Sequence, residues 1–210
     1  MKALFLAAIL ALTSPVARAD DVAGRFDYYV LALSWAPSWC RSGSDTRDST
    51  SCDTGRRAGF TVHGLWPQQE NGWPEDCLTT HRNPSRADTA KMRDLTGSSG
   101  LAWYQWRKHG RCSGLSAQDY FGATRAAYQA VQLPEVFRRL TREVSLSASV
   151  VEDAFIEANP GMDRRGITVT CRGQDLQEVR ICLTRDLQPR ACAPDAARDC
   201  SRKMLMPAPR

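Results

Sequence analysis

The chain has 210 residues, with 28 Lys and Arg against 23 Asp and Glu, which gives a formal net charge of +5. This mild basicity suits transient contact with a polyanion. It excludes a protein that binds nucleic acid tightly through a strongly basic surface. The length is sufficient for one domain with a sizeable hydrophobic core.

The N-terminal segment has the pattern of a secretory signal peptide. Lys2 is followed by an apolar stretch over residues 3–12, and Ala17-Arg18-Ala19 is typical of a cleavage site. The apolar stretch is well short of the ~20 residues that a membrane-spanning helix requires. We therefore expect residues 1–19 to be removed and residues 20–210 to form the mature domain, without a membrane anchor and with a net charge of +3 (26 basic minus 23 acidic residues).

The first half of the chain predicts one buried strand and much irregular structure. Residues 26–34 are aromatic-rich and largely apolar, which is typical of a buried strand. Residues 40–71 are rich in Ser, Gly, Asp and Arg and predict a loop around one short strand at residues 59–63. Residues 71–100 contain several Pro and Gly residues and predict irregular structure, with one short helix at residues 87–95.

Three helices are expected next. The sequence Ser-Ala-Gln-Asp at residues 116–119 resembles a capping box, and apolar residues recur from there through Val131. Pro134 can open a second short helix that extends through Leu140. A third begins at Ser149 and is ended by Asn159-Pro160.

Strands are expected in the last part of the chain. Residues 167–172 and 176–183 alternate in polarity like two strands joined by a turn at Gly173, and residues 200–207 can add an edge strand. The chain shows no repeat and no plausible linker. This order of elements predicts a single α+β domain with a mostly antiparallel central sheet and flanking helices.

The cysteines all follow the predicted signal peptide. Eight cysteines in an exported chain predict four disulfides formed in an oxidising compartment, either the periplasm or the medium. A zinc site is the competing interpretation, but the chain has no Cys-x-x-Cys pair and its cysteine spacings are long and irregular. We expect neither a metal nor a cofactor. The cysteines are Cys40, Cys52, Cys77, Cys112, Cys171, Cys182, Cys192 and Cys200.

Two of the three histidines lie in segments suited to RNA cleavage. His63 stands in FTVHGLWPQ, at the expected end of the short strand, and His109 stands in WYQWRKHGRC beside Lys108. RNA carries its own nucleophile, the 2′-hydroxyl, so an enzyme must deprotonate it, protonate the leaving 5′-oxygen and stabilise the charged phosphorane. Two imidazoles and a lysine can do this without a metal ion. His81 has no such context and is expected on a surface loop.

Together these segments resemble the two active-site motifs of the ribonuclease T2 family, and in particular its bacterial, periplasmic, ribonuclease I-like members. FTVHGLWPQ is similar to the first motif and WYQWRKHGRCSG to the second, and the resemblance extends over nearly the whole mature chain. It implies the disulfide-stabilised α+β fold of that family. The implied pairing is Cys40–Cys52, Cys77–Cys112, Cys171–Cys200 and Cys182–Cys192.

The resemblance also implies roles for individual residues. His109 matches the general base, His63 the general acid and Lys108 the residue that stabilises the transition state. The implied activity is a metal-independent endoribonuclease that cleaves single-stranded RNA by transesterification through a 2′,3′-cyclic phosphate, without an obligate protein partner. The catalytic candidates are His63, His109, Lys108 and Gln105, and the substrate-binding candidates are Trp66, which matches a base-stacking tryptophan, Gln68, Tyr104 and Trp106.

The chain departs from the family pattern at three of these positions. Gln105 stands where the family usually has Glu, Tyr104 where a third histidine is common, and Gln68 where some members carry an Asp that helps to read the base. Base preference therefore stays open. Gln105 also motivates an alternative function, a catalytically weakened RNA-binding protein of the same fold.

Two further alternatives concern the whole chain and its tryptophans. The modest net charge motivates a third function, a disulfide-rich secreted module with no nucleic-acid role. Trp103 is expected in the hydrophobic core, whereas core packing and substrate contact are equally supported for Trp106.

Overall fold

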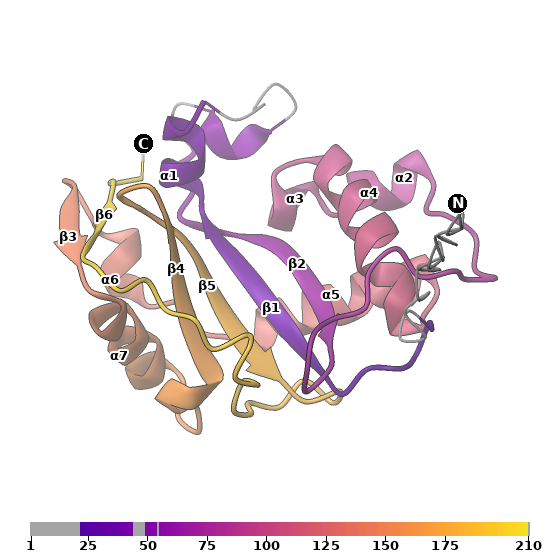
Figure 1. Ribbon diagram of the computed structural model, residues 1–210. Coiled ribbons are helices and arrows are strands. Elements are labelled where there is room, and N and C mark those ends of the chain that lie inside the picture. Colours follow the sequence, from indigo (N-terminus) through magenta and orange to yellow (C-terminus); the bar gives the residue numbers. More distant parts are fainter. Residues whose placement is uncertain (1–21, 44–48, 54, 210) are drawn as a thin grey trace, which may run out of the picture.

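The computed structural model describes residues 22–43, 49–53 and 55–209, so the predicted signal peptide lies outside the described residues. Within this part of the chain, one six-stranded sheet forms the centre of an α+β fold (Figure 1). The fold class is the one that the sequence predicts. The strands are β1 (Tyr28–Trp35), β2 (Phe60–Gln68), β3 (Val144–Leu146), β4 (Ile167–Arg172), β5 (Asp175–Leu183) and β6 (Met204–Met206).

The sheet has the strand order β2-β1-β5-β6-β3, and β4 also pairs with β5. All pairings are antiparallel except that of β5 with β6, which is parallel and joins Asp175 to Leu205. The predicted strand within residues 200–207 is confirmed, but its predicted place at the edge is wrong. The short strand β3, which the sequence did not predict, pairs with β6 and takes the edge position.

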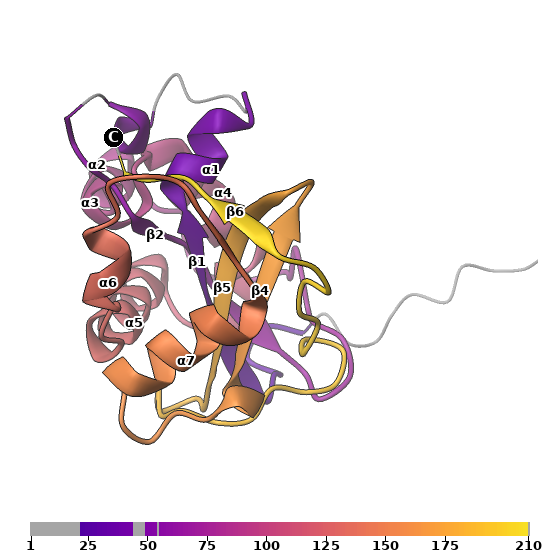
Figure 2. The ribbon, with the colours of Figure 1, turned by 90° about the vertical axis from the view of Figure 1, so that its left-hand side faces the viewer.

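The helices form two groups around the sheet. Helices α5, α6 and α7 cover one face (Figure 2), whereas α2, α3 and α4 lie beside strand β2 (Figure 1). No helix among the described residues has the length and apolar character of a membrane span. The helices are α1 (Ala36–Arg41), α2 (Arg86–Ala90), α3 (Arg93–Thr96), α4 (Ser99–Lys108), α5 (Ala117–Ala130), α6 (Glu135–Arg138) and α7 (Ala148–Ala158), and single 3₁₀ turns lie at Thr50–Cys52, Gly110–Ser113 and Arg164–Gly166.

The three helices predicted between residues 116 and 160 are present as α5, α6 and α7. The single helix expected at residues 87–95 is instead two short helices, α2 and α3. Helix α4, which carries residues 103–108 of the second motif, was not predicted. Ser98 caps it by accepting a hydrogen bond from the Leu101 amide, but its buried face includes the polar Gln105, so no clear apolar period marks it in the sequence.

The two faces of the sheet differ in what covers them. On the face under α5, α6 and α7, alternate residues of β1 join the main hydrophobic core, among them Leu31 and Leu33. On the other face, Tyr28 and Val30 belong to a much smaller cluster with Cys182. The thinly covered face is therefore free to carry a site.

Strand β2 is longer than predicted and contains a β-bulge at His63. Ala32 of β1 pairs with Gly64 and the next residue, Leu33, pairs with Val62, so His63 is an extra residue without a partner in the register. The prediction that the strand ends at His63 is therefore wrong. The bulge shifts the alternation of buried residues at this point, which makes the sequence pattern stop there although the strand continues.

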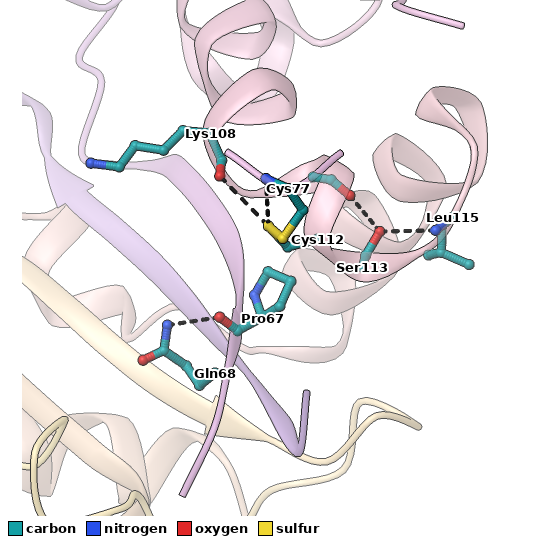
Figure 3. The surroundings of a disulfide bond; sticks show 8 residues. Pro67, Gln68, Cys77, Lys108, Cys112, Ser113 and Leu115 are labelled. Carbon is teal, nitrogen blue, oxygen red and sulfur yellow. Dashed lines mark hydrogen bonds between the residues drawn. A yellow bond between two sulfur atoms is a disulfide. The ribbon is translucent and has the colours of Figure 1, made fainter. Parts of the chain in front are cut away.

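Four disulfides join the strands and loops, with the pairing that the resemblance implies. Cys77–Cys112 closes a separation of 35 residues and lies just beyond the end of α4 (Figure 3). The Cys77 amide donates to the Cys112 sulfur at 3.3 Å, and both side chains are buried. This bridge holds the segment that follows His109 against the loop that contains Cys77.

Candidate active site

His63 projects from the bulge onto the thinly covered face of the sheet, where it meets Glu178 of β5. The Nδ1 atom of His63 lies 2.5 Å from Glu178 Oε1. Arg180, two residues along the same strand, donates from Nε to the other oxygen of Glu178 at 2.9 Å. Burial of Glu178 to 1 % exposure would raise its pKa, but the contacts with His63 and Arg180 lower it, so the carboxylate is charged.

Trp66 lies next to both motif histidines. Its ring centroid is 5.3 Å from that of His63 and 5.2 Å from that of His109. The Arg180 guanidinium lies over the indole, 5.1 Å from the ring centroid. The two motifs therefore meet at one aromatic ring, although 46 residues separate the histidines in the sequence (109 − 63).

Gln105 fixes the indole through a hydrogen bond. Trp66 Nε1 donates to Gln105 Oε1 at 2.7 Å, which ties β2 to α4. This contact requires a glycine at position 64, because a Cβ atom there would lie 2.2 Å from Gln105 Oε1 and 2.5 Å from Trp66 Nε1. The resemblance assigns Gln105 to catalysis; the structure shows it holding Trp66.

His109 ends helix α4 and is 8 % exposed. Its buried Nδ1 has no hydrogen-bond partner among the described residues. Burial, with smaller contributions from the charges of Lys108 and His63, lowers the pKa of His109 to about 3. The imidazole is therefore neutral near pH 7.

Lys108 carries the positive charge beside His109. Its side chain extends away from the Cys77–Cys112 disulfide (Figure 3), and its Nζ atom lies 3.2 Å from Glu75 Oε2. The contact with Glu75 raises the pKa of Lys108. The lysine is therefore charged, and an incoming anion competes with Glu75 for it.

These side chains surround a cleft of about 550 Å³. Trp73, Glu75, Arg180 and Asp195 complete its polar and aromatic lining. A cleft of this size, with an aromatic platform and a few converging polar groups, has the properties of a small-ligand or nucleotide site. Of the eight predicted site residues, seven line it: His63, Trp66, Gln68, Tyr104, Gln105, Lys108 and His109.

Trp103 lies elsewhere than expected, and Trp106 follows the first of its two alternatives, core packing. Trp106 is 0 % exposed and donates from Nε1 to Asn83 at 3.2 Å, so it belongs to the core and not to the substrate-binding set. Trp103, expected in the core, is 39 % exposed. The two residues are three apart in α4, and the buried face of that helix follows Ala102, Gln105 and Trp106. This face could not be identified without knowing that a helix was present.

The sequence prediction missed Glu75, Glu178 and Arg180. The only sign of the last two was a pair of opposite charges, two residues apart, in the otherwise apolar end of a strand. Such a pair is ordinarily solvent-facing, and nothing in the sequence marks Glu178 as the partner of a residue 115 positions away. Among the described residues, no three His, Cys, Asp or Glu side chains form a group that could hold a metal ion.

A sequence model of the ribonuclease T2 family matches residues 26–192. The chain belongs to the ribonuclease T2 family. A ribonuclease of Aeromonas hydrophila is 34 % identical over 177 residues, which cover 82 % of this chain and 79 % of the relative. Ribonuclease I of Escherichia coli (strain K12) is 28 % identical over 206 residues, covering 78 % of this chain and 77 % of that protein.

Solved structures of T2-type ribonucleases share the fold. Trichomaglin, described as an S-like ribonuclease, superposes with a TM-score of 0.69 at 21 % identity and covers 88 % of this chain and 99 % of that structure. An RNase-related protein from Calystegia sepium gives a TM-score of 0.66 at 21 % identity, covering 88 % and 98 %. At this level of identity the likeness concerns the fold alone.

The close packing at Gly64 leads to a stability prediction. Gly64→Ala should lower the free energy of unfolding by roughly 1–3 kcal/mol, because the new methyl group must displace the Trp66–Gln105 contact. Gly122→Ala is the matched control, since a Cβ atom there meets nothing within 4 Å and Ala favours a helix by up to about 1 kcal/mol. Urea denaturation measures the free energy of unfolding of the wild type and of both variants. A Gly64→Ala variant as stable as the wild type would show that Trp66 and Gln105 move aside at no cost.

Proposed function

We propose that this T2 family member is an exported endoribonuclease that cleaves single-stranded RNA by transesterification through a 2′,3′-cyclic phosphate. The observation that carries the proposal is that the His63 and His109 rings lie 5.3 Å and 5.2 Å from the same Trp66 ring, in one cleft that Lys108 also lines. The relatives named as ribonucleases and the four disulfides support it.

His109 acts as the general base on the 2′-hydroxyl. A base must be neutral before it accepts a proton, and the lowered pKa of His109 keeps it so. A group with a pKa of about 3 is a weak base, but the negative charge of a bound phosphate favours the protonated imidazole. Substrate binding therefore increases the basicity of His109.

His63 acts as the general acid on the leaving 5′-oxygen. The charged carboxylate of Glu178 binds the Nδ1–H of His63, which fixes the orientation of the ring. The opposite nitrogen, Nε2, then carries the proton to be transferred. Glu178 is a positioning residue, since it acts through His63 and does not itself reach the phosphate.

Lys108 stabilises the phosphorane that forms during attack. Its charge is available once the phosphate displaces Glu75, and Arg180 adds a second positive charge to the same cleft. Trp66 provides a stacking surface for the base of the nucleotide that carries the reacting 2′-hydroxyl. Stacking tolerates any base, and Gln68 and Tyr104 line the same cleft.

The proton-transfer roles lead to the deciding experiment. His63→Ala and His109→Ala should each reduce kcat roughly 10²–10⁴-fold, and the double variant should lose less than the product, because both residues act on one transition state. His81→Ala is the matched control, because His81 lies on an exposed loop outside the cleft. The measurement is cleavage of a defined oligoribonucleotide, with the product ends identified by mass spectrometry.

The same assay tests the chemistry. Activity should persist in EDTA, should yield 2′,3′-cyclic phosphate ends and should fail on DNA, which lacks the 2′-hydroxyl. Strong inhibition by EDTA, or equal cleavage of DNA, would be incompatible with the mechanism.

Residue 105 gives a prediction for the pH dependence. A carboxylate at this position, one helical turn before His109 and in the same cleft, should raise the pKa of the base. Because the base works only when neutral, Gln105→Glu should move the acidic limb of the kcat/KM profile to higher pH. Gln129→Glu, at an exposed position of α5, should leave the profile unchanged.

An unchanged acidic limb in Gln105→Glu would show that residue 105 is not electrostatically coupled to the base. An inactive wild type that Gln105→Glu activates would favour the weakened RNA-binding protein over the enzyme.

The contact between Glu178 and His63 gives a prediction for kcat. Glu178→Gln should lower kcat, but by less than the roughly 10²–10⁴-fold expected for loss of the imidazole itself, because the amide still orients the ring but lacks the charge. Glu157→Gln, exposed on α7, is the charge-matched control. In the His63→Ala background, Glu178→Gln should have little further effect; fully additive losses would mean that Glu178 acts on something other than His63.

A further inference from the structure

A second hollow, which we call the hydroxyl groove, begins at His63 and leads away from the cleft. It has a volume of about 1180 Å³ and lies between α1, the start of α4 and the hairpin that joins β4 to β5. Of the 21 residues that line it, eight are Ser or Thr. Ser38 is 5 % exposed, and its buried hydroxyl has no hydrogen-bond partner among the described residues. The lining is therefore equipped to bind a polar ligand.

The groove and the cleft form one path across the sheet. His63 lines both of them. On β1, Val30 lines the cleft, and Ser34, on the same face four residues later, lines the groove. A single-stranded polymer that passes His63 can therefore occupy the two hollows in succession.

The charges at the far end of the groove favour an anion. Its two carboxylates are already paired, Glu178 with His63 and Arg180, and Asp175 with Arg41, whose Nε donates to it at 3.1 Å. Arg172, directly opposite Asp175 in the register of the hairpin, also lines the groove and makes no ion pair with a described residue.

A second guanidinium lies at the same hairpin. Arg202 donates to the carbonyl oxygen of Gly173 at 2.6 Å and makes no ion pair with a described residue. Gly173 itself lines the groove. The tip of the hairpin thus presents two exposed positive charges that no carboxylate in the described residues neutralises.

The roles of the histidines give the path a direction. The base, His109, lines only the cleft, so the nucleotide that supplies the 2′-hydroxyl lies there. The acid, His63, protonates the leaving 5′-oxygen, so the leaving nucleotide and those that follow it enter the groove. Asp175, which is opposite Arg172 in the register, is three residues from Glu178 along β5, so the backbone of Arg172 lies up to about 10 Å along the hairpin from the partner of His63.

We propose that Arg172, assisted by Arg202, forms a subsite for a phosphate on the 3′ side of the cleaved bond, outside the two nucleotides that the bond joins. The subsite rests on the proposed function, because its place on the 3′ side of the cleaved bond follows from the role of His63 as the acid. With this subsite, the protein should cleave an RNA that continues on the 3′ side of the leaving nucleotide more efficiently than a dinucleotide.

Oligonucleotides with a single ribonucleotide test the proposal, because only that position can be cleaved. The comparison uses a dinucleotide, the same step extended by deoxynucleotides on its 3′ side, and the same step extended equally on its 5′ side. In the wild type, 3′ extension should raise kcat/KM above that of the dinucleotide. Arg172→Ala should reduce this gain about two- to fivefold, the range of a solvent-exposed ion pair, and Arg172→Lys should retain most of it.

Salt dependence gives an independent measurement. Loss of one phosphate contact should reduce the slope of log(kcat/KM) against log[salt] by about 0.7 for the 3′-extended substrate only. Arg139→Ala removes an exposed positive charge from the residue that follows α6, on the opposite face of the sheet, and should change neither the gain nor the slope. An unfolded variant would lose activity on all three substrates together.

The outcomes separate this proposal from the proposed function. No gain from 3′ extension in the wild type, a gain that survives Arg172→Ala, or equal losses on the 5′- and 3′-extended substrates would each overturn the subsite. Binding of the all-deoxy oligonucleotides, measured by fluorescence anisotropy, tests the subsite without cleavage. Binding that depends on Arg172 and on 3′ extension, in a protein that cleaves nothing, would reject the proposed function and retain the subsite.

Discussion

The extra residue in β2 decides which side chains reach the cleft. In a regular strand, residues three apart lie on opposite faces, so His63 and Trp66 could not both face the cleft. The bulge places both on one face together with Gly64, whose missing side chain leaves room for the bond between Trp66 and Gln105. That bond ties β2 to α4, the helix that ends in His109. The mutual placement of the two histidines thus follows from one inserted residue.

The two histidines, which we propose as acid and base, differ in their surroundings. A buried carboxylate is costly unless it is paired, and Glu178 is paired on both oxygens, by His63 and Arg180. This pair fixes the His63 ring, and Arg180 also lies over Trp66, so one strand contacts both side chains. His109 instead is buried and has Lys108 beside it, and both favour the neutral imidazole.

The sequence predicted those parts of the fold in which local pattern and tertiary structure agree. Strands β1, β4 and β5 and helix α5 were found because an apolar run, alternation or a capping residue marks them. Strand β2 was cut short because its bulge breaks the alternation, and α4 was missed because its buried face carries Gln105. Motif resemblance supplied His63 and His109, but Glu178 lies 115 residues from its partner, and only folding brings them together.

The glutamine at position 105 separates two roles that a glutamate would combine. An amide oxygen accepts the indole N–H as well as a carboxylate does, so the geometric role is kept, and a neutral side chain avoids the cost of burying a charge at this position. The electrostatic role is absent, because the neighbouring charges that act on His109 are those of Lys108 and His63. In the proposed mechanism, the anion that offsets them comes from the substrate. His109 is then a weak base in the empty cleft, and the phosphate of bound RNA raises its basicity.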